Sequence, residues 1–218
     1  MSKKKNTAII VAAGSGKRIG GSIEKQFLEI NGKPVLQYTL EKFERSNVVD
    51  EIIVVVPEKH VAALSSTIPN KWGISKTLHV VAGGKERHQS VYTALTLVEE
   101  STDIVLIHDG VRPFIRLQEI KILVESACEF GAAVIGITPK DTIKQIEGDF
   151  IRESLNRQEL LAVQTPQVFK RELILRAFEN NRNILTNVTD DAGLVEMVGE
   201  KVFVVKGGAH NVKITTPE

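Results

Sequence analysis

The chain alternates between short runs of apolar residues and longer stretches in which apolar residues recur every three or four positions. The short runs predict β-strands, at residues 8–13, 51–56, 78–81, 103–107, 131–137 and 201–205. The longer stretches predict amphipathic helices, at residues 34–43, 58–65, 91–98, 117–127, 173–178 and directly after 188–191. The third of these helices has the clearest pattern, because Val91, Ala94, Leu95 and Val98 fall on one helical face.

Strands that alternate with amphipathic helices indicate βαβ units. We therefore expect an α/β fold, a Rossmann-like three-layer arrangement in which helices cover both faces of a mostly parallel sheet. No internal repeat or low-complexity segment interrupts the pattern, so residues 1–218 are expected to form a single domain.

The α/β pattern changes between residue 141 and about residue 169. Residues 142–146 and 150–152 predict a β-hairpin around a turn that contains Gly148. A hairpin inserted into an α/β alternation often reaches beyond the domain body, so we expect an extended arm at residues 139–168 that forms a dimer. The alternative is an edge hairpin that lies on its own subunit.

Composition limits the possible partners and location of the protein. Its net charge is +1, from 28 basic and 27 acidic residues, so no bulk field attracts nucleic acid or an anionic membrane. The one cysteine, Cys128, excludes an internal disulfide and is expected to be a small buried core residue of a helix. No apolar run has the length of a signal-peptide core or a membrane span, so we expect a cytoplasmic protein.

Three of the predicted strands end in residues with distinctive chemistry, at 14–18, 83–87 and 108–112. In an open parallel sheet, ligands bind beyond the carboxyl ends of the strands. The sheet is therefore expected to bring these three segments to one edge.

The first strand end combines a Gly-rich turn, Gly14-Ser15-Gly16, with the cations Lys17 and Arg18. Backbone N–H groups and positive charge in one loop favour a polyphosphate ligand. The turn fits neither the dinucleotide fingerprint, because Ile19 stands at the third glycine position, nor the P-loop, because Arg18 follows Lys17. Lys25 is close enough in sequence to reach the same anion, and the alternative is a simple turn with solvated cations.

Asp109 directly follows the fourth predicted strand, so its carboxylate is expected at the ligand edge. Magnesium bound with nucleotide phosphates needs only one or two protein carboxylates. Asp109 could instead cap the next turn or pair with Arg112, and His108 is expected to be structural. No nucleophile and base are paired in the sequence, so the pattern favours phosphoryl or nucleotidyl transfer by positioning and charge stabilisation.

At these segments the chain resembles the 2-C-methyl-D-erythritol 4-phosphate cytidylyltransferase family. The resemblance rests on eight motifs that occur in order, at residues 12–18, 25–26, 83–91, 108–114, 141–144, 164–169, 189–192 and 211–215. It implies transfer of CMP from CTP to methylerythritol phosphate with release of pyrophosphate, with Mg²⁺ as cofactor and a homodimer as the assembly.

The resemblance also implies roles for individual residues. Arg18 and Lys25 would be catalytic, and Asp109 would hold Mg²⁺. The nucleotide would bind at Ala12, Ala13, Gly14, Ser15, Gly16, Gly83, Arg87 and Ser90. The sugar phosphate would contact Arg112, Thr165 and Lys213, while Thr142 and Arg157 on the arm would reach the neighbouring subunit's site.

Some positions leave other interpretations open. Glu24 stands where the family commonly has proline, and we expect this change to loosen the placement of Lys25. Val111 leans slightly toward the related ribitol-5-phosphate cytidylyltransferases, whereas residues 12–14 and 189–192 favour methylerythritol phosphate. A non-catalytic nucleotide-binding regulator is a more distant alternative, disfavoured by the intact charged residues.

Overall fold

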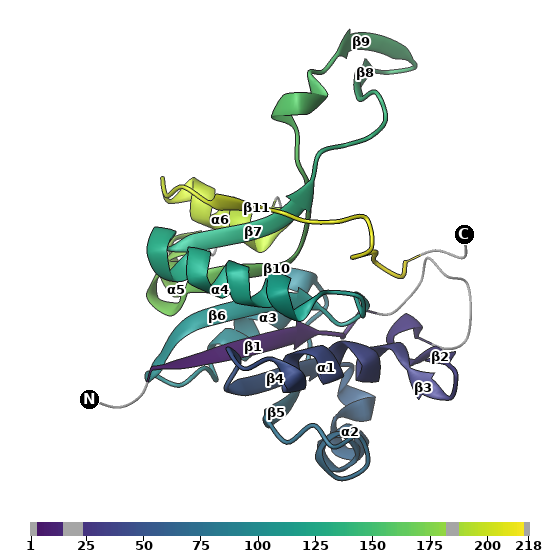
Figure 1. Cartoon of the computed structure of the whole chain (residues 1–218), viewed down its shortest axis with the longest axis vertical. Helices are drawn as coiled ribbons and strands as arrows, with labels where there is room; N and C mark the ends of the chain where they lie inside the picture. Colours follow the sequence, from purple (N-terminus) through teal and green to yellow (C-terminus); the bar gives the residue numbers. More distant parts are fainter. Residues whose placement is uncertain (1–3, 15–23, 182–187, 216–218) are drawn as a thin grey trace.

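The structure, a computed structural model, describes residues 4–14, 24–181 and 188–215. A seven-stranded sheet runs through its centre in the order β11-β7-β10-β6-β1-β4-β5 (Figure 1). In chain order these strands are β1 (Lys5–Val11), β4 (Glu51–Val56), β5 (Thr77–Ala82), β6 (Thr102–Asp109), β7 (Ala132–Ile137), β10 (Ala162–Lys170) and β11 (Phe203–Lys206). All neighbouring strands are parallel except where β10 pairs with β6 and β7.

Helices cover both faces of this sheet, which confirms the expected three-layer α/β fold. One face carries α1 (Val35–Arg45), α2 (Glu58–Asn70) and α4 (Leu117–Phe130), and the other carries α3 (Arg87–Leu95), α5 (Arg171–Asn180) and α6 (Asp191–Met197). Successive strand residues point to opposite faces, so Ile10 packs in the first layer of core and Ile9 in the second. Burial on both faces explains why the strands read as continuous apolar runs.

The sequence did not predict strand β10, which lies between β6 and β7 and is antiparallel to both. Its buried positions include the polar residues Gln164, Thr165 and Gln167, together with Pro166. Polar side chains and a proline inside a central strand hide the apolar pattern by which a strand is usually identified. These polar groups are buried here because each makes hydrogen bonds at or near the ligand edge.

The predicted hairpin forms, as β8 (Lys144–Glu147) and β9 (Phe150–Ser154), and it projects from the body of the molecule (Figure 1). The short 3₁₀ helix η2 (Arg157–Glu159) follows it. The projecting part is shorter than the expected arm of residues 139–168, because the chain returns to the main sheet along β10. Every residue of β8 and β9 is exposed, including the apolar Phe150 at 80%.

A smaller hairpin, β2 (Glu29–Ile30) and β3 (Lys33–Pro34), lies between the 3₁₀ helix η1 (Lys25–Phe27) and α1. Its turn residues Asn31 and Gly32 both have positive φ, of 51° and 75°. An Asn-Gly pair favours this two-residue turn, so the sequence carries a local signal for the hairpin.

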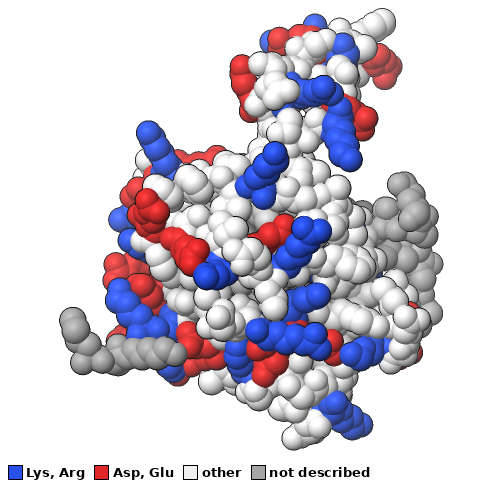
Figure 2. Space-filling view, in the orientation of Figure 1, with Lys and Arg blue, Asp and Glu red and all other residues white. Residues whose placement is uncertain are grey.

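The surface agrees with the near-neutral composition. Acidic and basic side chains are interspersed over the face drawn in Figure 2, which shows no field of one sign. Cys128 is exposed on α4, which corrects the expectation of a buried core residue: Val124 and Ala127 face the core and Cys128 points away from it. In the part of the chain that the structure describes, no helix is long and apolar enough to cross a membrane.

Candidate active site

The predicted convergence of strand ends occurs at a cavity of about 600 Å³. Residues that follow β1, β5 and β6 line it, and so do η1 and the segment after β11. The predicted site residues in its wall are Ala12, Ala13, Gly14, Lys25, Arg87, Ser90, Asp109 and Lys213. Ser15, Gly16 and Arg18 lie outside the described residues.

Gly83 lies where the first two strand ends touch. A Cβ atom on Gly83 would stand 2.2 Å from the Cβ of Ala13 and 2.7 Å from the Ser90 hydroxyl oxygen, so only glycine fits. The Ser90 hydroxyl accepts a hydrogen bond from the Gly84 amide at 3.1 Å and donates to the Glu86 carbonyl at 3.3 Å. These small residues bring the β1 and β5 loops together at one side of the cavity.

Asp109 is the last residue of β6, and three cations surround its carboxylate. Lys213 Nζ lies 2.9 Å and Arg112 Nε 3.3 Å from Oδ2, while Arg87 Nε lies 3.6 Å from Oδ1. Burial opposes ionisation of Asp109, but the charges of Arg87, Lys213 and Arg112 outweigh it and hold the pKa of this carboxyl well below its usual range. Asp109 is therefore an anion at any pH at which the protein works, and it does pair with Arg112.

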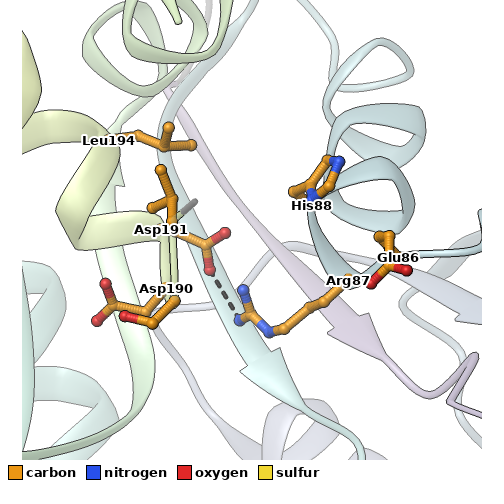
Figure 3. Close-up of a pocket in the computed structure, with 8 residues that line it drawn as sticks. Glu86, Arg87, His88, Asp190, Asp191 and Leu194 are labelled. Atoms are coloured by element: carbon orange, nitrogen blue, oxygen red, sulfur yellow. Dashed lines mark ion pairs between the residues drawn. The ribbon is translucent and has the colours of Figure 1, made fainter. Parts of the chain in front are cut away.

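Arg87 lines this cavity and also a smaller one of about 300 Å³, which lies between the start of α3 and the start of α6. Its Nη2 atom forms an ion pair of 2.8 Å with Asp191, drawn as the dashed line in Figure 3. Burial alone would lower the pKa of Arg87, but the charges of Asp191 and Asp109 raise it above its ordinary value. The guanidinium is thus held between two carboxylates that lie far apart in the sequence, at the end of β6 and at the start of α6.

Gln167 on β10 holds the start of α6 in place. Its side-chain oxygen accepts hydrogen bonds from the amides of Asp191 and Ala192, both at 3.0 Å. Its side-chain nitrogen donates to the Asp190 carboxylate at 2.7 Å, and Asp190 in turn caps α6 by accepting from the Gly193 amide. The buried amide of Gln167 therefore fixes the position of Asp191, and through it that of Arg87.

His108 lies behind Asp109, fully buried against the ring of Phe43. Burial lowers the pKa of His108 to about 4, so the ring is neutral near pH 7. Its Nε2 faces the Arg112 carbonyl at 3.1 Å and must carry the proton, because a carbonyl oxygen only accepts. Nδ1 then accepts from the Thr165 hydroxyl at 3.1 Å, and Thr165 Oγ1 accepts from the Asp109 amide at 3.0 Å.

The segment after β11 reaches the site through Asn211. The Asn211 side chain donates to the Thr165 carbonyl at 2.9 Å, and its own carbonyl accepts from Arg112 Nη1 at 2.8 Å. The Ile214 amide donates to the Val111 carbonyl at 3.0 Å. These bonds hold Lys213 beside Asp109.

Gly83, Arg112 and Thr165 do not line the cavity themselves but contact Ser90 or Asp109 in its wall. Two other predicted residues lie away from it. Thr142 and Arg157 are exposed on the projecting arm, where Arg157 Nη1 donates to the Lys140 carbonyl at 2.5 Å. In the described parts of the chain, no group of three or more His, Cys, Asp or Glu side chains could hold a metal ion by itself. A metal at the cavity would need further ligands from a bound molecule.

Residues 6–218 match the protein family described as 2-C-methyl-D-erythritol 4-phosphate cytidylyltransferase. The chain belongs to this family. It is 45% identical to the 2-C-methyl-D-erythritol 4-phosphate cytidylyltransferase of Clostridium botulinum strain Langeland over 215 residues, which cover 98% of this chain and 93% of that protein. The protein of the same name from Clostridium perfringens strain SM101 is 45% identical over 98% of this chain and 95% of its own length.

Solved structures related to the family have the same fold. The 4-diphosphocytidyl-2C-methyl-D-erythritol synthase of Anaerococcus prevotii superimposes with a TM-score of 0.85 at 33% identity, over 98% of this chain and 93% of that one. The 2-C-methyl-D-erythritol 4-phosphate cytidylyltransferase of Francisella tularensis gives 0.81 at 30% identity, over 98% and 95%. The nucleotidyltransferase fold expected from the sequence is therefore confirmed.

Sequence reasoning assigned no role to Gln167 or Asp191, although both lie in motifs that carry the family resemblance, at 164–169 and 189–192. Two acidic residues before a helix are adequately explained as a cap and first turn, so nothing local indicated that Asp191 would pair with Arg87. The pairing depends on how α3, α6 and β10 pack.

The buried neutral His108 predicts a pH dependence of stability. A histidine whose folded-state pKa lies below its unfolded value stabilises the fold fully above the unfolded pKa of 6.5, and this contribution is lost as the pH falls toward about 4. The loss amounts to about 3 kcal/mol in the free energy of unfolding. We expect His108→Gln to flatten this dependence in urea denaturation at pH 7, 6 and 5, and an unchanged slope would contradict the assignment.

Proposed function

We propose that this protein transfers the CMP group of CTP to 2-C-methyl-D-erythritol 4-phosphate, giving CDP-methylerythritol and pyrophosphate for isoprenoid synthesis by the non-mevalonate route. One observation carries the proposal: Lys25, Arg87, Asp109 and Lys213 line a single cavity at the edge of the sheet, together with Gly14. A cavity with several cations and one ionised carboxylate suits a reaction between two polyanions. The family match favours methylerythritol phosphate over ribitol 5-phosphate.

The reaction needs little proton chemistry. A phosphate monoester has its second pKa near 6, so it is largely dianionic near pH 7 and attacks as an anion. An oxygen of the sugar phosphate bonds to the α-phosphorus of CTP, and the bond from that phosphorus to the departing pyrophosphate breaks. His108 is buried, neutral and hydrogen-bonded on both ring nitrogens, so it is no candidate for a base.

The β1 and β5 loops are assigned to the nucleotide. Backbone groups of residues 12–16 would contact the triphosphate, since a Gly-rich turn after a buried strand presents N–H groups to anions. Gly83, Arg87 and Ser90 would recognise the cytidine portion. The close approach of Gly83 to Ala13 keeps the β1 and β5 loops side by side, so one ligand could contact both.

Arg18 and Lys25 are assigned to the transition state, in which negative charge spreads over the oxygens of the α-phosphoryl group. Arg112 and Lys213 are assigned to the sugar phosphate. The one hydroxyl proton of Thr165 is donated to His108, so we assign Thr165 to holding the Asp109 amide rather than to donating directly to the phosphate.

Mg²⁺ is the proposed cofactor, and Asp109 fits the role of its protein ligand. The carboxylate is ionised, and its Oδ1 lies 3.6 Å from Arg87 Nε, farther than Oδ2 lies from Lys213 or Arg112. Three cations already surround Asp109, so the metal would bind together with CTP phosphates, whose oxygens supply ligands and offset the positive charge. When bound, Mg²⁺ would neutralise charge that develops on the phosphates.

We also propose that residues 1–218 form one catalytic domain that dimerises through its projecting arm. Ile146, Phe150 and Ile151 on the hairpin are 69%, 80% and 64% exposed. Apolar side chains on a projecting hairpin favour burial against a second surface. Thr142 and Arg157 would then enter the neighbouring subunit's site.

The substrate assay tests the reaction. Purified protein with Mg²⁺ and CTP should release pyrophosphate with 2-C-methyl-D-erythritol 4-phosphate, and much more slowly with ribitol 5-phosphate. Faster turnover of ribitol 5-phosphate would reverse the order of the two substrates. CTP binding without turnover of either would favour the nucleotide-binding regulator.

Variants of Arg18 and Lys25 test their role in the transition state. Because the charge that these cations stabilise develops during the reaction, we expect Arg18→Ala and Lys25→Ala each to lower kcat by about 10²-fold or more. The KM for CTP should change far less. Losses of similar size in kcat and in CTP affinity would place both residues in ground-state binding.

Complementation between subunits tests the arm. Arg157→Ala and Lys25→Ala homodimers should each be poorly active, because every site lacks one group. An equal mixture allowed to exchange subunits should recover about a quarter of wild-type activity, since half the dimers are mixed and each contains one intact site. No recovery, with exchange verified by differently tagged subunits, would mean that the arm does not serve a partner's site.

A further inference from the structure

Glu24, the residue just before η1, makes a hydrogen bond with His60 and an ion pair with Lys59 at the start of α2. Its Oε2 lies 2.7 Å from His60 Nε2, and its Oε1 lies 2.8 Å from Lys59 Nζ. The ring of Phe27, at the other end of η1, packs edge-on against the His60 ring with centroids 4.5 Å apart. His60 therefore touches the residues on both sides of the Lys25-Gln26 pair.

A further contact holds η1 from the opposite direction. The buried side chain of Gln26 donates from Nε2 to the Gly14 carbonyl at 3.2 Å, which ties η1 to the loop after β1. Lys25 stands between these anchors and lines the cavity. Its backbone is thus attached to the nucleotide loop on one side and to α2 on the other.

These anchors matter because η1 cannot hold its own position. It is three residues long, with internal backbone hydrogen bonds only from Phe27 N to Glu24 O and from Leu28 N to Lys25 O. A single 3₁₀ turn is not stable by itself. In contrast, α2 is fixed to the sheet, because Leu64 and Ile68 are part of the core and β4 leads directly into the helix.

The negative charge of Glu24 favours its contacts with Lys59 and His60. Burial opposes its ionisation, but hydrogen bonds from Lys59 and His60 outweigh it, so the pKa of Glu24 lies below its ordinary value. The Lys59 side chain is 67% exposed and His60 only 32%. The exposed ion pair with Lys59 contributes little to stability, so the contact with His60 is the stronger of the two contacts that Glu24 makes with α2.

We propose that Glu24 and His60 are positioning residues, which hold η1 against α2 so that the Lys25 ammonium points into the active-site cavity. This inference rests on the proposed function, in which Lys25 acts in the transition state. It reverses the expectation that Glu24 loosens Lys25: the carboxylate provides an anchor through its side chain.

Steady-state kinetics of Glu24→Gln and His60→Ala test the proposal. Each should lower kcat by about tenfold, which is the lower end of the effect expected when a hydrogen bond to a charged group is lost. The KM for CTP should stay within about twofold of the wild-type value. His60→Gln keeps an N–H donor near the Nε2 position and should recover most of the rate. Matched controls are Glu58→Gln on the exposed face of α2 and His79→Ala on the exposed face of β5, which should leave kcat unchanged.

A double-mutant cycle separates positioning of Lys25 from a general structural effect. In a Lys25→Ala background, His60→Ala should change kcat by less than about twofold, because the group that it positions is gone. Thermal unfolding of each variant checks that the fold is intact. If His60→Ala is unfolded, Glu24→Gln replaces it in the cycle. Wild-type kcat in both single variants, or an undiminished loss in the Lys25→Ala background, would overturn the proposal. Absence of turnover by the wild-type protein would instead reject the proposed function.

Discussion

The active site depends on the ion pairs that offset the negative charge of one buried carboxylate, Asp109. Moving an ionised carboxylate out of water is unfavourable unless opposite charges and hydrogen bonds replace the lost solvent. Here the compensation comes from Arg87 at the start of α3, Arg112 in the loop after β6, and Lys213 in the segment after β11. Because these cations come from three separate parts of the chain, the charge of Asp109 draws the strand ends and the last described segment together.

Each of these charged groups is in turn held by buried polar residues. Gln167 fixes Asp191, which pairs with Arg87, while Thr165 and Asn211 hold the Asp109 amide and Arg112. The polar residues of β10 are therefore the supports of the site, inside the sheet itself. A site that is organised before its ligands bind loses less to reorganisation during the reaction, which suits a transfer that proceeds by positioning and charge stabilisation.

Lys25, to which a role in the transition state is assigned, lies outside the central sheet. Lys25 belongs to a short 3₁₀ helix rather than to the sheet, and side chains from Glu24 and Gln26 attach that helix to its neighbours. Figure 1 shows the same division on a larger scale, with a layered body and a hairpin that projects away from it. Arg87, Asp109 and Lys213 are thus built into the body, whereas Lys25 and the arm residues Thr142 and Arg157 are attached at its edges.

The α/β layers and the three strand ends that form the cavity could be predicted from the order of residues alone. Runs such as 51–56 and helical patterns such as Val91 to Val98 depend on local burial, which a continuous apolar run or a period of 3.6 residues reports directly. The strand ends also indicated Asp109 and Arg87 as members of one site, and the family resemblance added Lys213. These patterns did not indicate which individual side chains, far apart in the sequence, would pair with one another.

Three features depend on the tertiary structure: the antiparallel pairing of β10, the exposure of Cys128 to solvent, and the ion pair between Asp191 and Arg87. The tertiary structure also decided the role of Glu24, whose partners Lys59 and His60 lie about 35 residues further along the chain, on another element. The physical reason is the same in each case. A polar or charged side chain in a sequence carries no record of its partner, and whether it is buried and compensated or solvated depends on which elements pack against it.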